Sequence, residues 1–154
     1  MAEGDDEWFA RFIGPEADAE LRLVTVRVAE QRELDMVELL KGWRAHVVKI
    51  ERDMPLPMSD RSVWGAHDFL AALYLRDFLE SGISGVREEF VPNVRAAIED
   101  VDARFISYTV ADDLRLNERV DRREQPDAPW WWRRIPLSGP AREELAQYGA
   151  VGPM

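Results

Sequence analysis

Apolar side chains recur every three or four residues along two stretches of this chain, and this spacing constrains the fold more than any other feature. In the first stretch the steps are four, three, four, three and four, which lays one apolar stripe along a helix. We predict a helix over residues 33–54, ended by Pro55 and Pro57 because proline lacks a backbone donor. Its stripe consists of Met36, Leu40, Trp43, Val47, Ile50 and Met54.

Two further helices are predicted on similar grounds. Residues 62–81 are apolar on most sides, so this helix should be central, and good N-cap residues precede it at Ser59, Asp60 and Ser62. Residues 92–110 start with Pro92, a residue suited to the first helical turn. Their stripe is Val91, Val94, Ile98, Val101, Phe105 and Tyr108. We therefore expect a mainly α fold, a compact antiparallel helical bundle with a Trp-rich C-terminal segment.

An α+β fold is the alternative. Residues 21–28 are rich in β-branched side chains and could form a strand, with residues 105–110 as its partner in a small two-stranded sheet. Gly14-Pro15 and Gly139-Pro140 both resemble helix starts. The second of these should open a short helix over residues 141–148.

The length of 154 residues fits a single domain. We divide it into an acidic N-terminal segment, residues 1–14, and one helical domain, residues 15–154. Within this domain we expect a polar connection at 111–128 and a Trp/Arg segment plus short helix at 130–148. The chain has no cysteine, which excludes disulfides, Cys-ligated metals and thiol nucleophiles. No signal peptide or membrane-length apolar run is visible, so we expect a cytoplasmic protein without membrane contact.

Charge points to the kind of partner. The chain has 20 basic and 30 acidic side chains, a formal net charge of −10. This balance argues against a nucleic-acid partner, which needs clustered Lys and Arg, and favours a basic protein partner. Eighteen of the 20 basic residues are arginine, which suggests a GC-rich coding genome and a bacterial source.

Three adjacent tryptophans followed by two arginines form the most distinctive motif, Trp130, Trp131, Trp132, Arg133 and Arg134. Three neighbouring indoles cannot all face one way in a helix or strand, so at least one should cover the surface or meet a partner. Trp and Arg are also enriched at binding hot spots. The structural alternative is that the indoles seal one end of the bundle while the arginines pair with surface acids.

Catalytic and cofactor signals are sparse. His67 and Asp68 form the one adjacent His-Asp pair, but His46 is the only other histidine, so we predict neither a metal site nor a cofactor. No serine lies in a Gly-x-Ser-x-Gly elbow, and no glycine motif of a phosphate-binding loop occurs. We therefore assign no catalytic residue, and His67 and Asp68 stay as candidates.

Three hypotheses follow. The first is a non-catalytic, inhibitor- or immunity-like protein that binds a basic partner through Trp130, Trp131, Trp132, Arg133, Arg134, Asp112 and Asp113, with further acids at Asp5, Asp6 and Glu7. The second is a small enzyme or ligand-binding protein with an interhelical pocket, lined by Trp43, Trp64, Tyr74 and Phe78 and using His67, Asp68 and His46. The third is a homodimer joined through the Trp segment.

Overall fold

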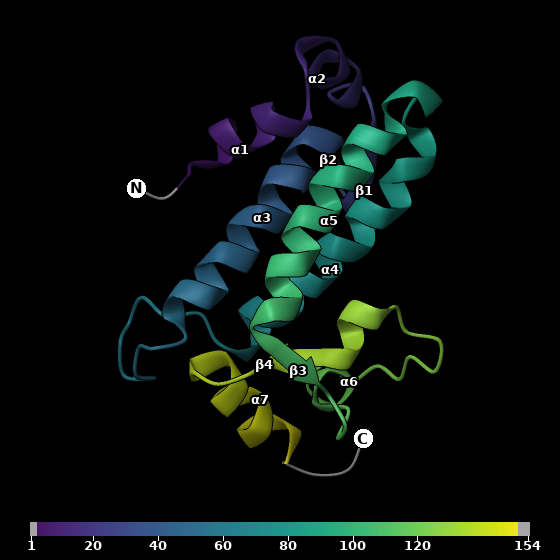
Figure 1. Ribbon diagram of the computed structural model, residues 1–154. Helices are drawn as coiled ribbons and strands as arrows, with labels where there is room; N and C mark the ends of the chain where they lie inside the picture. Colours follow the sequence, from purple (N-terminus) through teal and green to yellow (C-terminus); the bar gives the residue numbers. More distant parts are fainter. Residues whose placement is uncertain (1–2, 151–154) are drawn as a thin grey trace. The chain divides into compact units, whose positions relative to one another are not determined.

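The predicted helices are present as α3, α4 and α5 in the computed structural model, which describes residues 3–150 (Figure 1). Their bounds are Met36–Asp53, Ala66–Gly82 and Val91–Ser107. Every member of the first stripe from Met36 to Ile50 is buried, as is the third stripe from Val94 to Tyr108. The prediction of a mainly α fold is therefore confirmed.

Shorter elements precede and follow these helices. In chain order they are α1 (Asp5–Phe12), α2 (Pro15–Leu21), β1 (Thr25–Ala29), β2 (Arg32–Asp35), the 3-10 helices η1 (Ile83–Gly85) and η2 (Glu88–Phe90), β3 (Thr109–Ala111), α6 (Leu116–Asp121), the 3-10 helix η3 (Trp130–Arg133), β4 (Arg134–Pro136) and α7 (Pro140–Gly149). No helix in residues 3–150 combines the length and the apolar composition that crossing a membrane requires.

The chain divides into two units. Unit 1 comprises residues 1–45 and 74–103, and unit 2 comprises residues 46–73 and 104–154. Each of the three long helices contributes one part to unit 1 and the other part to unit 2.

In unit 1, consecutive long helices run antiparallel. Gly42 of α3 lies against Leu75 of α4, while Gly82 at the end of α4 lies against Met36 at the start of α3. The core of this unit includes Trp8, Phe9, Leu21, Met36, Leu39, Leu40, Trp43, Leu79, Val94 and Ile98. Burial of these side chains provides most of the stabilisation of the unit.

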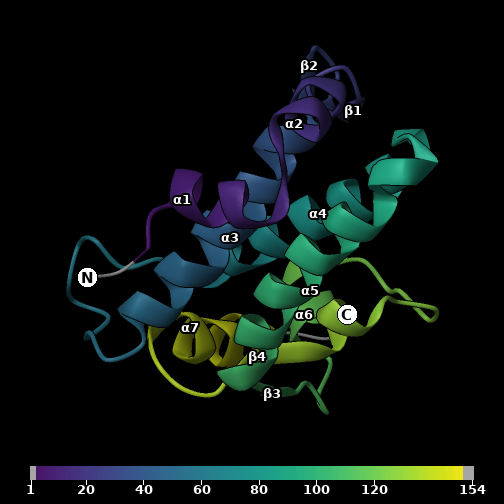
Figure 2. The same ribbon diagram turned by 45° about the horizontal axis from the view of Figure 1, so that its top comes forward.

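A β-hairpin of unit 1 lies next to α2 in both views (Figures 1 and 2). Strands β1 and β2 pair antiparallel, with Val26 opposite Leu34. The alternative sheet from the sequence is therefore wrong in its pairing. Residues 25–29 do form a strand, but they pair with β2 across a short turn, because a local partner needs little loop closure.

Helix α3 begins with a capping box. The Asp35 carboxylate accepts a hydrogen bond from the Glu38 amide at 2.8 Å, and the Glu38 carboxylate accepts one from the Asp35 amide at 3.1 Å. Two otherwise unpaired amides at the helix start are thereby satisfied. This explains why the helix starts at Met36 rather than at residue 33.

Unit 2 contains a second two-stranded sheet. Strands β3 and β4 are antiparallel, with Val110 opposite Ile135. The Tyr108 hydroxyl donates to the Val47 carbonyl at 2.8 Å, and burial raises the pKa of Tyr108. The core of the unit includes Val47, Ile50, Phe69, Leu73, Phe105, Tyr108, Trp131, Trp132, Ile135 and Leu145.

Two predicted helix boundaries are corrected by the structure. Helix α4 starts at Ala66, four residues later than predicted, because the Asp60 carboxylate bonds the Ser62 amide and holds a turn there. Helix α5 ends at Ser107 because residues 109–111 leave it to form β3.

The two predicted Gly-Pro helix starts are confirmed, but their glycines differ. Pro15 opens α2 after Gly14 at φ −77°, and Pro140 opens α7 after Gly139 at φ +94°. A Cβ on Gly139 would lie 2.8 Å from the backbone of Met54, whereas a Cβ on Gly14 would meet nothing within 4 Å. Only the second motif therefore requires glycine.

Candidate functional site

The Trp motif is mostly buried. It forms the 3-10 helix η3, in which Trp131 is 5% and Trp132 0% exposed, whereas Trp130 is 39% exposed. The Trp130 ring lies edge-on to that of Trp131, with centroids 5.6 Å apart, and 6.2 Å from that of Phe105. Of the three indoles, Trp130 alone offers substantial area to a partner.

Both arginines that follow are held by interactions within unit 2. Arg133 forms an ion pair with the buried Glu118 at 2.6 Å and donates to the Gln125 carbonyl at 2.7 Å. Arg134 donates to the hydroxyl and the carbonyl oxygen of Thr109, both at 2.7 Å. These guanidinium groups fasten the Trp segment to α6 and β3.

The two neighbouring aspartates, Asp112 and Asp113, lie in different environments. Asp112 is buried, and its carboxylate accepts the amides of Leu116 and Asn117 at 2.9 and 3.0 Å. Burial raises the pKa of Asp112, although these amide hydrogen bonds act in the opposite direction. Asp112 therefore caps the start of α6, whereas Asp113 is exposed.

His67 and Asp68 lie in the first turn of α4 in unit 2. The Asp68 carboxylate accepts the Gly65 amide at 2.9 Å, so it serves as a cap. His67 is exposed and its ring stacks on Tyr148 with centroids 5.6 Å apart, while the His46 ring lies 4.9 Å from that of Trp64. Among residues 3–150 there is no group of three or more His, Asp or Glu side chains that could hold a metal ion.

The residues proposed to line a pocket do not share one environment. Trp43 is fully buried in unit 1, where its indole nitrogen donates to Asp102 at 3.0 Å. Tyr74 and Phe78 are half-buried in unit 1, and Trp64 is half-buried in unit 2. A wide, open depression of about 520 Å³ lies instead beside the charged side chains Arg87, Glu88 and Glu89. Its charged lining differs from that of a typical small-molecule site.

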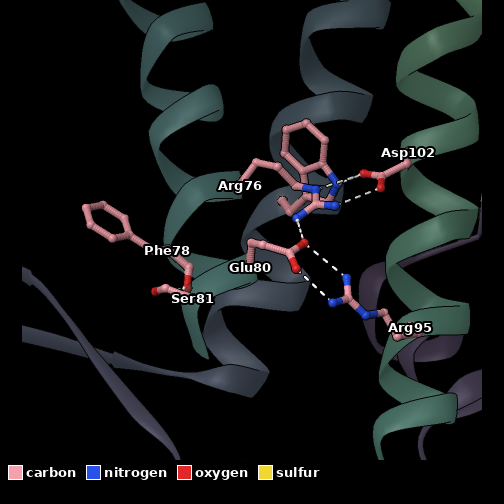
Figure 3. A network of polar contacts seen from close by, with 7 residues as sticks. Arg76, Phe78, Glu80, Ser81, Arg95 and Asp102 are labelled. Carbon is pink, nitrogen blue, oxygen red and sulfur yellow. Dashed lines mark hydrogen bonds and ion pairs between the residues drawn. The ribbon is translucent and has the colours of Figure 1, made fainter. Parts of the chain in front are cut away.

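Unit 1 holds a network of charged side chains between its helices. Arg76 of α4 donates twice to Asp102 of α5, at 3.0 and 2.9 Å, and both are buried. Glu80 bridges Arg76 and Arg95 (Figure 3). The hydrogen bond from Arg95 contributes most to lowering the pKa of Glu80. This network links α4 to α5.

Two of the N-terminal acids form ion pairs that link helices of unit 1. Asp5 pairs with Arg44 at 2.6 Å and Asp6 with Lys41 at 2.8 Å. The hydrogen bond from Lys41 lowers the pKa of Asp6. These contacts hold α1 against α3, and Glu7 is the acid of the first turn of α1 whose carboxylate has no ion pair to another described residue.

Sequence reasoning missed the buried charges Arg76, Asp102 and Glu118. The four-residue spacing of Arg76 and Glu80 could have indicated one ion pair. The partner of Arg76 at position 102 lies 26 residues away, and no local pattern marks such a contact.

Net charge differs sharply between the units. Unit 1 has 18 Asp and Glu side chains against 9 Lys and Arg, a net charge of −9. Unit 2 has 12 against 11, a net charge of −1. Nearly all of the acidity seen in the composition therefore belongs to unit 1.

The chain matches no protein-family model, and comparisons with curated proteins and with solved structures return no significant match.

Proposed function

We propose that this chain is a non-catalytic interaction protein, inhibitor- or immunity-like, whose unit 1 binds a basic protein partner. The observation that carries the proposal is the concentration of charge, −9 in unit 1 against −1 in unit 2. A surface of one dominant sign attracts oppositely charged proteins and raises their association rate.

Several acids of unit 1 are available to such a partner. They are exposed, and within residues 3–150 their side-chain carboxylates form no hydrogen bond or ion pair: Glu7, Glu16, Glu30 and Glu88. Charges already paired inside the unit, such as that of Asp102, are shielded by their partners. The four free carboxylates are therefore the group whose removal should change partner binding most.

Of the partner-binding residues expected from the sequence, Trp130 and Asp113 are exposed. Trp131, Trp132 and Asp112 are buried, so they have little area to offer. In this proposal the exposed acids of unit 1 set the association rate of the basic partner.

The partner can be identified by immobilising the tagged chain, adding extract of its own host at low salt, and eluting with a salt gradient. We expect one stoichiometric basic protein that is released as salt rises, because ionic strength screens the attraction. The purified partner is then used to measure association and dissociation rates.

A variant with Glu7, Glu16, Glu30 and Glu88 all changed to Gln tests which unit binds. We expect its association rate to fall by about tenfold or more, with a smaller change in dissociation. The matched control changes the exposed acids Asp113 and Asp127 to Asn and Glu124 and Glu143 to Gln, the same charge change in unit 2. The proposal would be refuted if the two variants lowered the association rate equally, or if partner binding did not depend on salt concentration.

A further inference from the structure

The large apolar side chains that are exposed lie mainly in unit 2, whereas the net charge lies mainly in unit 1. Five of the six large apolar side chains that are well exposed in residues 3–150 belong to unit 2, and only Leu23 belongs to unit 1. Two of the five, Leu114 at 69% and Trp130 at 39% exposed, stand near the two ends of residues 113–130. We call residues 113–130 the α6 segment because they contain that helix.

The α6 segment also exposes charges of both signs. Arg115 and Arg122 flank the helix, and Asp113 and Asp127 lie in the connections on either side. All four are exposed, and none has a hydrogen bond or ion pair from its side chain to another described residue. Exposed apolar side chains and unpaired charges of both signs supply the chemistry that a surface needs to bind a copy of itself. A two-fold interface between identical chains requires this property, because the same patch supplies both sides.

Internal contacts hold the α6 segment in place. The Arg133 guanidinium joins Glu118 of the helix to the Gln125 carbonyl of the connection that follows it. Asp112 caps the helix start, and the Asn117 side-chain amide donates to the Trp132 and Arg134 carbonyls at 3.0 and 2.8 Å. A surface fixed before binding loses less conformational entropy when it docks.

We propose that the α6 segment is a homotypic docking surface, whose partner is the same segment of a second copy of this chain. Net charge favours a second copy of the chain over a basic protein as the partner of the α6 segment. A strongly basic partner is drawn to unit 1, whereas the net charge of −1 lets two copies of unit 2 approach without strong repulsion. Contact through unit 1 would instead oppose two charges of −9.

Two charge-reversed variants test the proposal without knowledge of the individual ion pairs. The first, Arg115→Glu with Arg122→Glu, leaves the four charged positions all acidic. The second, Asp113→Arg with Asp127→Arg, leaves them all basic. We expect the wild type to dimerise reversibly in sedimentation equilibrium, and each variant alone to have a dimer dissociation constant raised by about tenfold or more. An equimolar mixture of the two variants should restore a dimer with one copy of each, detectable by native mass spectrometry.

The matched controls make the same net-charge changes at exposed residues of unit 1, Arg22→Glu with Arg32→Glu and Glu7→Arg with Glu16→Arg, and should leave the dimer unchanged. Trp130→Ala should weaken it, and circular dichroism establishes that every variant is folded. A wild type that stays monomeric at a few hundred micromolar overturns the proposal. So does a dimer that neither variant weakens, or a mixture that stays monomeric. Binding of the basic partner depends on the acids of unit 1, so it can fail or succeed independently of these results.

Discussion

The two units differ in net charge, in the burial of their ion pairs and in the apolar side chains that they expose. Unit 1 carries a net charge of −9, buries Arg76 with Asp102 and, among its described residues, exposes one large apolar side chain, Leu23. Unit 2 carries −1, buries the pair of Glu118 and Arg133 less completely and exposes five large apolar side chains within the part that the structure describes. The net charge of unit 1 can attract basic molecules over a long range, whereas the exposed apolar side chains of unit 2 act only in direct contact.

The largest predicted effect on stability is a difference between Trp132 and Trp130 of unit 2. Trp132→Ala should lower the free energy of unfolding by about 3–5 kcal/mol, because it leaves a cavity where a fully buried ring lay. Trp130→Ala serves as the matched control and should change it by less than about 1 kcal/mol. Urea unfolding followed by circular dichroism measures both. Similar losses from the two variants would contradict the burial described for this segment.

Removing the carboxylate at the centre of unit 1 should come next. Asp102→Ala removes the carboxylate that accepts two hydrogen bonds from the buried Arg76 guanidinium and leaves it the half-exposed Glu80, so it should lower the free energy of unfolding by about 3 kcal/mol. The control is Glu99→Ala, which removes an exposed acid of the same helix. A loss no greater than that of the control would show that the network of Arg76 contributes little to unit 1.

The two Gly-Pro helix starts allow a direct comparison between the units. Gly139→Ala in unit 2 should cost about 2 kcal/mol, because alanine disfavours φ +94° and its Cβ would meet the Met54 backbone. Gly14→Ala in unit 1 has open space and an ordinary φ, so thermal unfolding should change little. If both variants unfold at the wild-type temperature, the strained conformation assigned to Gly139 is incorrect.

The smallest predicted effect concerns pH. The Arg95 hydrogen bond lowers the pKa of Glu80 below its ordinary value of 4.5, so the unfolded chain binds the proton more readily. The stabilisation is therefore full above pH 4.5 and is lost as the pH falls through the lower folded value. Because Glu80 is partly exposed, we expect less than about 1 kcal/mol.

The variant Glu80→Gln should reduce this loss of stability between pH 5 and 3, which urea midpoints at several pH values can measure. In unit 2 burial raises the pKa of Asp112 above its ordinary value, so the folded chain binds this proton more readily than the unfolded chain, and the contribution of Asp112 to stability falls as the pH rises. Asp112→Asn should therefore alter the pH dependence in the opposite direction. Identical pH profiles for both variants and the wild type would argue against either shift.

Local sequence patterns predicted the long helices well because helix periodicity is a short-range property. The stripe from Met36 to Ile50 is buried as expected, and both Gly-Pro pairs begin helices. Strand pairing was predicted less well. Residues 25–29 could be recognised as a strand, but their partner at residues 32–35 contains Arg32 and Glu33 and has no apolar alternation.

The candidate surfaces were predictable only in part. Backbone geometry predicts that three adjacent indoles cannot all face one way, but which of them is exposed is decided by the 3-10 turn that buries Trp131 and Trp132. Asp112 and Asp113 are identical in sequence terms, yet one caps α6 and the other faces solvent. Two neighbouring aspartates can have different roles because only one of them is placed to accept the unpaired amides at the start of a helix.

The sequence by itself determined the helical class, the absence of cysteine chemistry and the net charge of −10, because these depend on composition and on spacing within a few turns. Only the tertiary structure decided that the charge belongs to unit 1, that Arg76 meets Asp102, and that Arg133 is held by Glu118. Contacts between particular residues far apart in the chain depend on how helices pack, and the apolar spacing along one helix does not tell which residue of another helix each side chain meets.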